Sequence, residues 1–161
     1  MPTIGIADTT FARVDMATPA IQAIRKTDPK IKIQRYTVPG FKDLPVACLR
    51  LLKTCDIVLA LGWVGGEKID EVCAHEASLG LIAVQLQTGK HVLSAFVHTS
   101  ESPGNEKRLQ EIALDRAVKH AKNCVELLRG PTALTAHAGT GRRQGGKDAG
   151  ALPFKSRDRK K

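Results

Sequence analysis

The sequence predicts a single α/β domain, a three-layer sandwich in which helices cover both faces of a mainly four-stranded parallel sheet. Four short segments rich in apolar and β-branched residues are bounded by Gly, Pro or Asp, as strands are. Segments with helical apolar stripes alternate with them, and this alternation favours parallel strands joined by right-handed crossovers. With 161 residues, 42% of them hydrophobic, the chain can build one ordinary core.

The four expected strands are residues 3–8, 31–38, 56–63 and 91–99. Because strands followed by crossover helices run in the same direction, the loops that follow them should meet at one edge of the sheet.

Four helical patterns lie between and after these strands. The first runs from about Asp15 to Thr27, and Thr18 before Pro19 is an alternative start. The second begins near Leu44 and tolerates Pro45 because Pro45 falls in the first turn. The third covers about 69–87 and the fourth about 106–128, where Gly130-Pro131 stops it.

The net charge of +9 is concentrated at the C-terminus. From Arg142 onward there are eight basic and two acidic residues, so the rest of the chain is nearly balanced. We therefore expect a domain over 1–133 and a Gly-rich basic segment over 134–161 that crosses a neighbour or hangs loose, with a flexible end. Nucleic-acid binding by this segment is a minor hypothesis, because it lacks interleaved aromatic residues that would stack on bases.

Other composition features exclude several classes of protein. No apolar run approaches the roughly 20 residues of a membrane helix, and the first strand begins at once without a leader, so we expect a soluble cytoplasmic protein with no membrane partner. The four cysteines show no close-paired metal spacing, which favours packing roles for them. The sequence thus predicts no bound metal.

Two loops at the carboxyl edge of the sheet are candidate walls of one pocket. ADTTFARVD (7–15) follows the first strand and VPGFKDLP (38–45) follows the second. Open α/β sheets bind ligands at this edge. Four of the six aromatic residues of the chain fall in these loops or near the ends of the third and fourth strands, which suits a flat ligand; they are Phe11, Phe41, Trp63 and Phe96.

A glycine-rich turn after the third strand tests the idea of a nucleotide site. Gly62-Trp63-Val64-Gly65-Gly66 precedes a helix, as a phosphate-binding turn would. It matches neither GxGxxG nor GxxxxGK[ST], so a dinucleotide is disfavoured. These glycines instead allow a tight turn or the close approach of a ligand.

Four titratable residues are candidates for chemistry at the site. Asp43 precedes the second helix, where it either complements the helix dipole or accepts hydrogen bonds from vicinal hydroxyls of a polyol. His75 and Glu76 are adjacent on a helix and so point about 100° apart. Histidine relays protons near neutral pH, but a lone helical histidine is more often a packed or surface residue. His98 has a better position, at the carboxyl end of the fourth strand.

Several stretches of the sequence resemble the archaeal riboflavin synthase family. They are ADTTFARVDMA, VPGFKDLPVAC, DIVLALGW, VCAHEASLGL, FVH and the late RQGGKDAG. The resemblance covers about Thr3 to Gly150. That family is similar to lumazine synthase, whose VPG loop is echoed at 38–45, so the resemblance implies a flavodoxin-like, lumazine synthase-like fold.

Three departures from lumazine synthase bear on the reaction. Its ring-stacking aromatic in the VPG loop falls on Lys42, its aromatic in the fourth strand falls on Ser94, and its GNKG phosphate motif is missing around 121–124. Riboflavin synthase takes two copies of the phosphate-free 6,7-dimethyl-8-ribityllumazine, so these losses favour the riboflavin-forming reaction. The missing aromatics also leave room for one lumazine ring to stack on the other.

The resemblance implies a transferase that moves a four-carbon unit between two lumazines. The products are riboflavin and 5-amino-6-(ribitylamino)uracil, in the last step of riboflavin biosynthesis. No redox or organic cofactor is implied, and a divalent cation such as Mg²⁺ is allowed by the family although the sequence shows no clear ligand cluster for it. A homo-oligomer, a pentamer with sites between neighbouring subunits, is also implied.

The resemblance and the edge argument together give the expected site. Proton-transfer or orienting roles fall to His75 and Glu76, and Asp43 binds ribityl hydroxyls. The expected substrate-binding residues are Thr9, Thr10, Phe11, Val38, Pro39, Gly40, Phe41, Leu44, Gly62, Trp63, Ser94, Phe96 and His98. Lumazine synthase, and a lumazine or flavin carrier without turnover, are the alternatives to riboflavin synthase.

Overall fold

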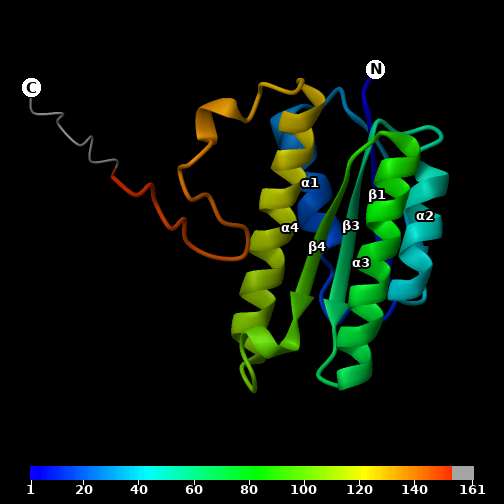
Figure 1. The fold of residues 1–161 in the computed structure, drawn as a ribbon, viewed down its shortest axis with the longest axis vertical. Coiled ribbons are helices and arrows are strands. Elements are labelled where there is room, and N and C mark those ends of the chain that lie inside the picture. Colours follow the sequence, from blue (N-terminus) through cyan, green and yellow to red (C-terminus); the bar gives the residue numbers. More distant parts are fainter. Residues whose placement is uncertain (154–161) are drawn as a thin grey trace, which may run out of the picture.

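The computed structural model describes residues 1–153 and shows a parallel sheet between two layers of helices (Figure 1). The strands are β1 (Thr3–Thr9), β2 (Lys32–Val38), β3 (Ile57–Val64) and β4 (Val92–His98), in the order β2-β1-β3-β4. All three pairings are parallel. The predicted α/β class, strand positions and strand direction are confirmed.

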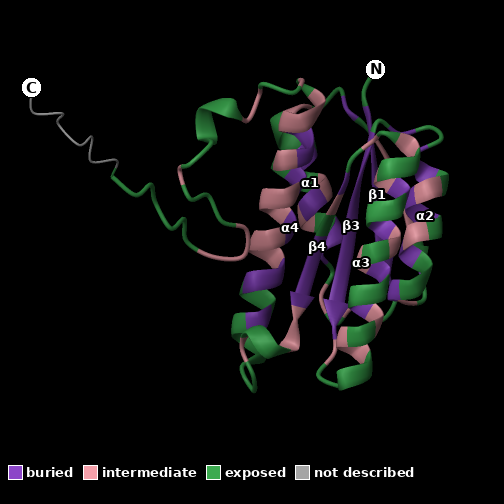
Figure 2. Cartoon of the chain, in the orientation of Figure 1, coloured by how far each residue is buried: buried purple, intermediate pink, exposed green. Residues whose placement is uncertain are grey.

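The helices divide between the two faces of the sheet. On one face lie α1 (Ala17–Thr27) and α4 (Glu106–Leu128), and on the other lie α2 (Leu44–Leu51) and α3 (Lys68–Thr88). Every residue of the central strands β1 and β3 is buried, as expected for a sheet covered on both sides (Figure 2). The four predicted helices are therefore present, within one or two residues at most ends.

Local signals in the sequence explain where the helices begin and end. The Asp15 carboxylate accepts hydrogen bonds from the backbone and hydroxyl of Thr18 and so orders the first turn of α1. Glu67 and Asp70 form a capping box at the start of α3, and Gly89 ends α3 in the left-handed region with φ 64°. Asn105 caps α4 by accepting from the backbone of Arg108.

The C-terminal segment folds back along its own α4. The Gly145 backbone donates to Asp115 Oδ2 at 2.8 Å, and Lys119 Nζ donates to the Gly146 carbonyl at 2.6 Å. Gly145 has φ +89°, and a Cβ there would lie 2.6 Å from Arg116 Nη2. The expectation that this segment hangs loose is thus wrong up to about Gly150, while the basic KSRDRKK end at 155–161 lies outside the described residues.

The cysteines have packing roles in the folded chain. Cys48, Cys55 and Cys124 are buried, and all four are free thiols. Burial raises the pKa of Cys48 to about 12 and also raises the pKa of Cys124, so these thiols stay protonated and unreactive. In the described part of the chain, no helix combines the length and apolarity needed to cross a membrane.

Acid should weaken the fold through His120. Burial, with a smaller contribution from Arg116, lowers the pKa of His120 from 6.5 to about 4. Between these values the unfolded chain binds a proton that the folded chain does not, so the free energy of unfolding falls as pH falls through this window. We expect a loss of about 2 kcal/mol after allowance for the partly exposed ring.

The measurement is urea unfolding at about pH 7 and about pH 5 for the parent and for His120→Met, which keeps the side-chain volume. The variant should lose much of the pH dependence. Equal pH dependence in both proteins would rule His120 out as its source.

Candidate active site

The loops that follow the four strands meet at one edge, as predicted. The first loop is tied to the second by the Thr10 backbone, which donates to Val38 O at 2.9 Å, and by Thr10 Oγ1, which donates to Pro39 O at 3.3 Å. Thr99 Oγ1, after β4, donates to Val64 O at the end of β3 at 2.7 Å. The edge is therefore built from the segments that follow all four strands.

A cavity of about 430 Å³ opens at the ends of β1 and β2. Its charged centre is Asp8, which accepts from the Arg35 guanidinium through both oxygens and from Thr37 Oγ1 at 2.7 Å. The bond to Asp8 raises the pKa of Arg35, so Arg35 stays charged at every physiological pH. The hydroxyl of Thr9 is buried without a hydrogen-bond partner among the described residues. The polar side chains that line this cavity can donate hydrogen bonds to the hydroxyl groups of a ligand or accept hydrogen bonds from them.

Sequence reasoning missed Asp8, Arg35 and Thr37. Thr37 is the register partner of Asp8, and Arg35, two residues earlier, points to the same side of the sheet. The register of the first two strands therefore predicts this ion pair. Once that register is known, the opposite charges of Asp8 and Arg35 lie close together on neighbouring strands.

The four aromatic residues do not line one wall of a single pocket in the folded chain. Phe41 and Phe96 pack edge to face with ring centroids 4.8 Å apart, on the face covered by α2 and α3. Trp63 is buried on the opposite face, against α1 and α4, because it alternates with Gly62 and Val64 along β3. Phe11 is 49% exposed and so is the aromatic ring of this edge that presents its surface to a ligand.

Gly62 is required by the aromatic pair. A Cβ at Gly62 would lie 2.5 Å from Phe41 Cε1 and 3.0 Å from Phe96 Cδ1. Gly65 has a different function: its missing Cβ leaves room for the Asp70 carboxylate, and Phe11 lies 3.4 Å from that Cβ position. Of these two glycines, only Gly65 borders the exposed ring of Phe11.

Replacing Gly62 with alanine should destabilise the protein by about 1 to 3 kcal/mol, because the added methyl overlaps the Phe41 ring. Gly66→Ala is the matched control, since a Cβ there meets only Thr99 Cγ2 at 3.9 Å. Urea unfolding of both variants measures the difference. Equal stability of the two variants would contradict this assignment.

The remaining expected site residues have varied surroundings. Glu76 is exposed and pairs with Lys42 across a 2.6 Å contact between α3 and the VPG loop, while His75 is exposed on α3. Asp43 and Ser94 are exposed, Gly40 and His98 are half-buried, and Leu44 is fully buried under the loop. His75 and Glu76 thus do not meet at one point of this chain.

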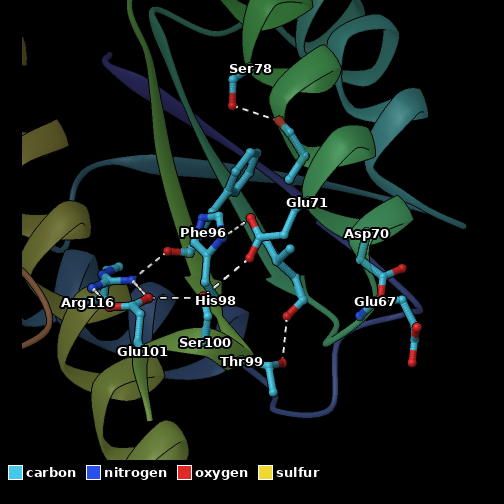
Figure 3. A network of polar contacts seen from close by, with 12 residues as sticks. Glu67, Asp70, Glu71, Ser78, Phe96, His98, Thr99, Ser100, Glu101 and Arg116 are labelled. Atoms are coloured by element: carbon cyan, nitrogen blue, oxygen red, sulfur yellow. Dashed lines mark hydrogen bonds and ion pairs between the residues drawn. The ribbon is translucent and has the colours of Figure 1, made fainter. Parts of the chain in front are cut away.

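A polar network occupies the carboxyl end of β4 (Figure 3). His98 Nδ1 lies 2.8 Å from Glu71 Oε2, and Ser100 Oγ donates to Glu71 Oε1 at 3.3 Å. Arg116 binds both oxygens of Glu101, at 2.6 and 2.7 Å, and this bond lowers the pKa of Glu101. Glu71 and Arg116 were missed in the sequence, because nothing local to either helix indicates contact with the end of a strand.

The residues do not form a metal centre. Within residues 1–153 there is no group of three or more His, Cys, Asp or Glu side chains placed to hold an ion. We therefore assign no step of the reaction to a cation.

The chain matches known proteins over most of its length. The family model of 6,7-dimethyl-8-ribityllumazine synthase matches residues 2–131. Riboflavin synthase of Methanothermobacter thermautotrophicus is 51% identical over 92% of this chain and 98% of that relative, and riboflavin synthase of Aeropyrum pernix is 50% identical over 92% and 97%. 6,7-Dimethyl-8-ribityllumazine synthase of Pyrobaculum arsenaticum is 34% identical, over 55% of this chain and 57% of that relative.

The parallel sheet, its two helical layers and the family model define the class, which is the lumazine synthase family. Within this class the full-length similarity at about half identity is to riboflavin synthases of archaea. The chain belongs to the archaeal type of riboflavin synthase, and the resemblance seen in the sequence is confirmed.

Proposed function

We propose that the protein forms riboflavin by dismutation of two molecules of 6,7-dimethyl-8-ribityllumazine. One molecule gives a four-carbon unit to the other, which yields riboflavin and 5-amino-6-(ribitylamino)uracil. The observation that carries this proposal is the 51% identity to a riboflavin synthase across 92% of the chain, against 34% across 55% for a lumazine synthase. The reaction needs no oxidant, because the two products together contain the atoms of the two substrates.

The binding roles follow from exposure at the sheet edge. Phe11 stacks on one lumazine ring, and the backbone of Val38 to Gly40 contacts the ring edge. Asp43, exposed at the start of α2, accepts hydrogen bonds from ribityl hydroxyls. The positions of the two lost aromatics support face-to-face rings, since Lys42 turns to Glu76 and Ser94 is small and exposed.

Positioning supplies most of the rate enhancement in this proposal. Good relative geometry of two reactants lowers a barrier by about 7 to 11 kcal/mol. Base stacking on an aromatic side chain contributes about 1 to 3 kcal/mol per ring. Proton transfer by a placed side chain adds a factor of about 10² to 10⁴. The site therefore has to hold two flat molecules together before it has to move protons.

An exposed apolar face on α3 supports assembly of several chains. Figure 2 shows exposed residues along the outward side of this helix. Val72, Leu79, Ile82 and Leu86 are 48%, 54%, 50% and 82% exposed, and with His75 they repeat at alternating spacings of three and four residues. That spacing is typical of a helix that packs on other helices. We call these five residues the α3 seam.

The α3 seam, with exposed Val46 of α2 nearby in the same layer, is the proposed contact between subunits. A ring of five chains, as the family resemblance implies, would place each site between neighbours. His75 then lies in the subunit contact, where it faces a neighbour. Such sharing explains how a small domain encloses two ligands.

The test is to incubate the purified protein with 6,7-dimethyl-8-ribityllumazine alone and to follow both products by chromatography. Equal amounts of riboflavin and the uracil, with the substrate falling twice as fast as either product rises, are expected. Binding without products would indicate a carrier. Formation of lumazine from the uracil and a phosphorylated dihydroxybutanone would indicate lumazine synthase, which the matching family model keeps as the second candidate.

A further inference from the structure

The carboxyl end of β4 carries a histidine whose ring is fixed by a carboxylate from α3. We propose that His98 is the proton-carrying residue of the reaction and that Glu71 is the residue that positions its ring. This inference rests on the proposed riboflavin-forming function. It moves the acid-base role from His75 and Glu76 to a pair that the structure brings into contact.

The contact determines which ring nitrogen is available. An ionised carboxylate can only accept, so Glu71 Oε2, 2.8 Å from His98 Nδ1, requires the proton of the neutral ring to sit on Nδ1. Nε2 then holds the lone pair and is the atom that takes a proton. Ser100 holds the second oxygen of Glu71 at 3.3 Å, so the carboxylate is directed from both sides.

The backbone that carries His98 is clamped to α4. Arg116 Nη1 donates to Phe96 O at 2.6 Å and also binds Glu101. Glu101 Oε1 in turn accepts from the His98 backbone N–H at 2.9 Å. These contacts hold the backbone of His98 in place independently of Glu71, as surrounding residues do for the reacting groups of active sites (Figure 3).

The pair lies beside the expected ring-binding surface. Gly65 and Gly66 form the turn after β3, Phe11 lies 3.4 Å from the Cβ position of Gly65, and Thr99, next to His98, lies 3.9 Å from that of Gly66. Phe11 and the pair therefore flank the same two-glycine turn. The His98 side chain is 34% exposed, so a ligand at this edge can reach it.

His75 lacks each of these features. It is exposed on the α3 seam, and its neighbour Glu76 bonds to Lys42. A proton carrier needs a fixed orientation, and of these two histidines His98 is the one whose ring has a side-chain partner in the described part of the chain.

The proposed step is balanced in protons and electrons. Nε2 of His98 removes a proton from the C7 methyl group of one lumazine, which leaves an electron pair delocalised over that ring and a charged imidazole facing the Glu71 carboxylate. The methyl carbon then bonds to an electrophilic ring carbon of the second lumazine, and the π electron pair displaced by this new bond moves onto a ring nitrogen of that molecule. His98 returns the proton to that nitrogen, so the enzyme ends neutral as it began.

Two variants and a control test the proposal. His98→Gln supplies an amide N–H that can donate to Glu71 but has no basic nitrogen, and we expect kcat to fall about 100-fold, within the usual range for a lost acid-base group. Glu71→Gln should lower kcat about tenfold with KM unchanged, because the ring loses its orienting charge. His91→Gln, one residue before the start of β4, should keep parental activity.

The second readout is incorporation of deuterium from D₂O into the C7 methyl group of bound lumazine, measured by NMR above the rate in buffer. His98→Gln should lose this enzyme-dependent exchange while still binding lumazine, and thermal unfolding checks that it folds. If the parent makes riboflavin and His98→Gln retains exchange and kcat within about threefold, the proposal is overturned and the function stands. If the parent itself makes no riboflavin, the proposed function fails.

Discussion

In the assembly proposed above, glutamate in place of both Leu79 and Ile82 should separate the subunits into single chains and abolish most riboflavin formation. Both residues are half exposed on the α3 seam of the single chain, so the substitutions leave its core intact. In a subunit contact, each carboxylate would be buried without a partner, which costs about 3 to 5 kcal/mol. That is a factor of about 100 or more in the affinity of each contact.

Sedimentation and activity together measure this effect. The double variant should sediment as a monomer, keep a cooperative unfolding transition, and form riboflavin at least about 100-fold more slowly. Leu152→Glu is the matched control, because Leu152 is 92% exposed and lies far from α3 in sequence. A double variant that keeps both the parental mass and the parental activity would exclude the α3 seam as the subunit contact.

The fold was predictable because its signals are local. Periodicity places the strands and helices, and the Gly130-Pro131 stop and the start of α4 at Glu106 agree with the structure. The start of α1 was less certain, because both Asp15 and Thr18 can begin a helix, and in the structure they cooperate through two hydrogen bonds. Competing local signals of this kind are resolved only by the tertiary packing that follows.

The site was predictable only as an edge of the sheet. Position after a strand correctly placed Thr10 beside Val38, but it said nothing of which face a side chain takes. Trp63 and Phe96 end neighbouring strands yet face opposite helical layers, because alternation along each strand decides the face. The contact between His98 and Glu71 joins a strand end to a helix 27 residues away, and no periodic pattern encodes it.

The C-terminal segment shows a related limit of prediction from composition. Its glycines and charges are typical of a loose tail, yet Gly145 and Gly146 bond to side chains of α4. A chain with left-handed glycines such as Gly141 and Gly145 can turn back tightly where other residues cannot. Composition alone therefore could not separate a tail that docks from one that does not.

Truncating Trp63 to alanine should be among the most destabilising single changes in the chain. Its side chain is 3% exposed, packed between the sheet and the layer of α1 and α4. Loss of a buried Trp costs about 3 to 5 kcal/mol, a large share of the stability of a domain of this size. The midpoint of thermal unfolding should fall by about 10 °C.

Trp63→Phe separates packing from ligand contact, because it keeps a flat ring and most of the volume. If Trp63 acts through the core, this variant should lose only part of the stability and keep the parental KM for lumazine. A KM raised tenfold with stability unchanged would instead make Trp63 a wall of the substrate site. Since Trp63 is the only tryptophan of the chain, the parent offers a direct check: its fluorescence should resist added quencher, as expected for an indole covered by α1 and α4.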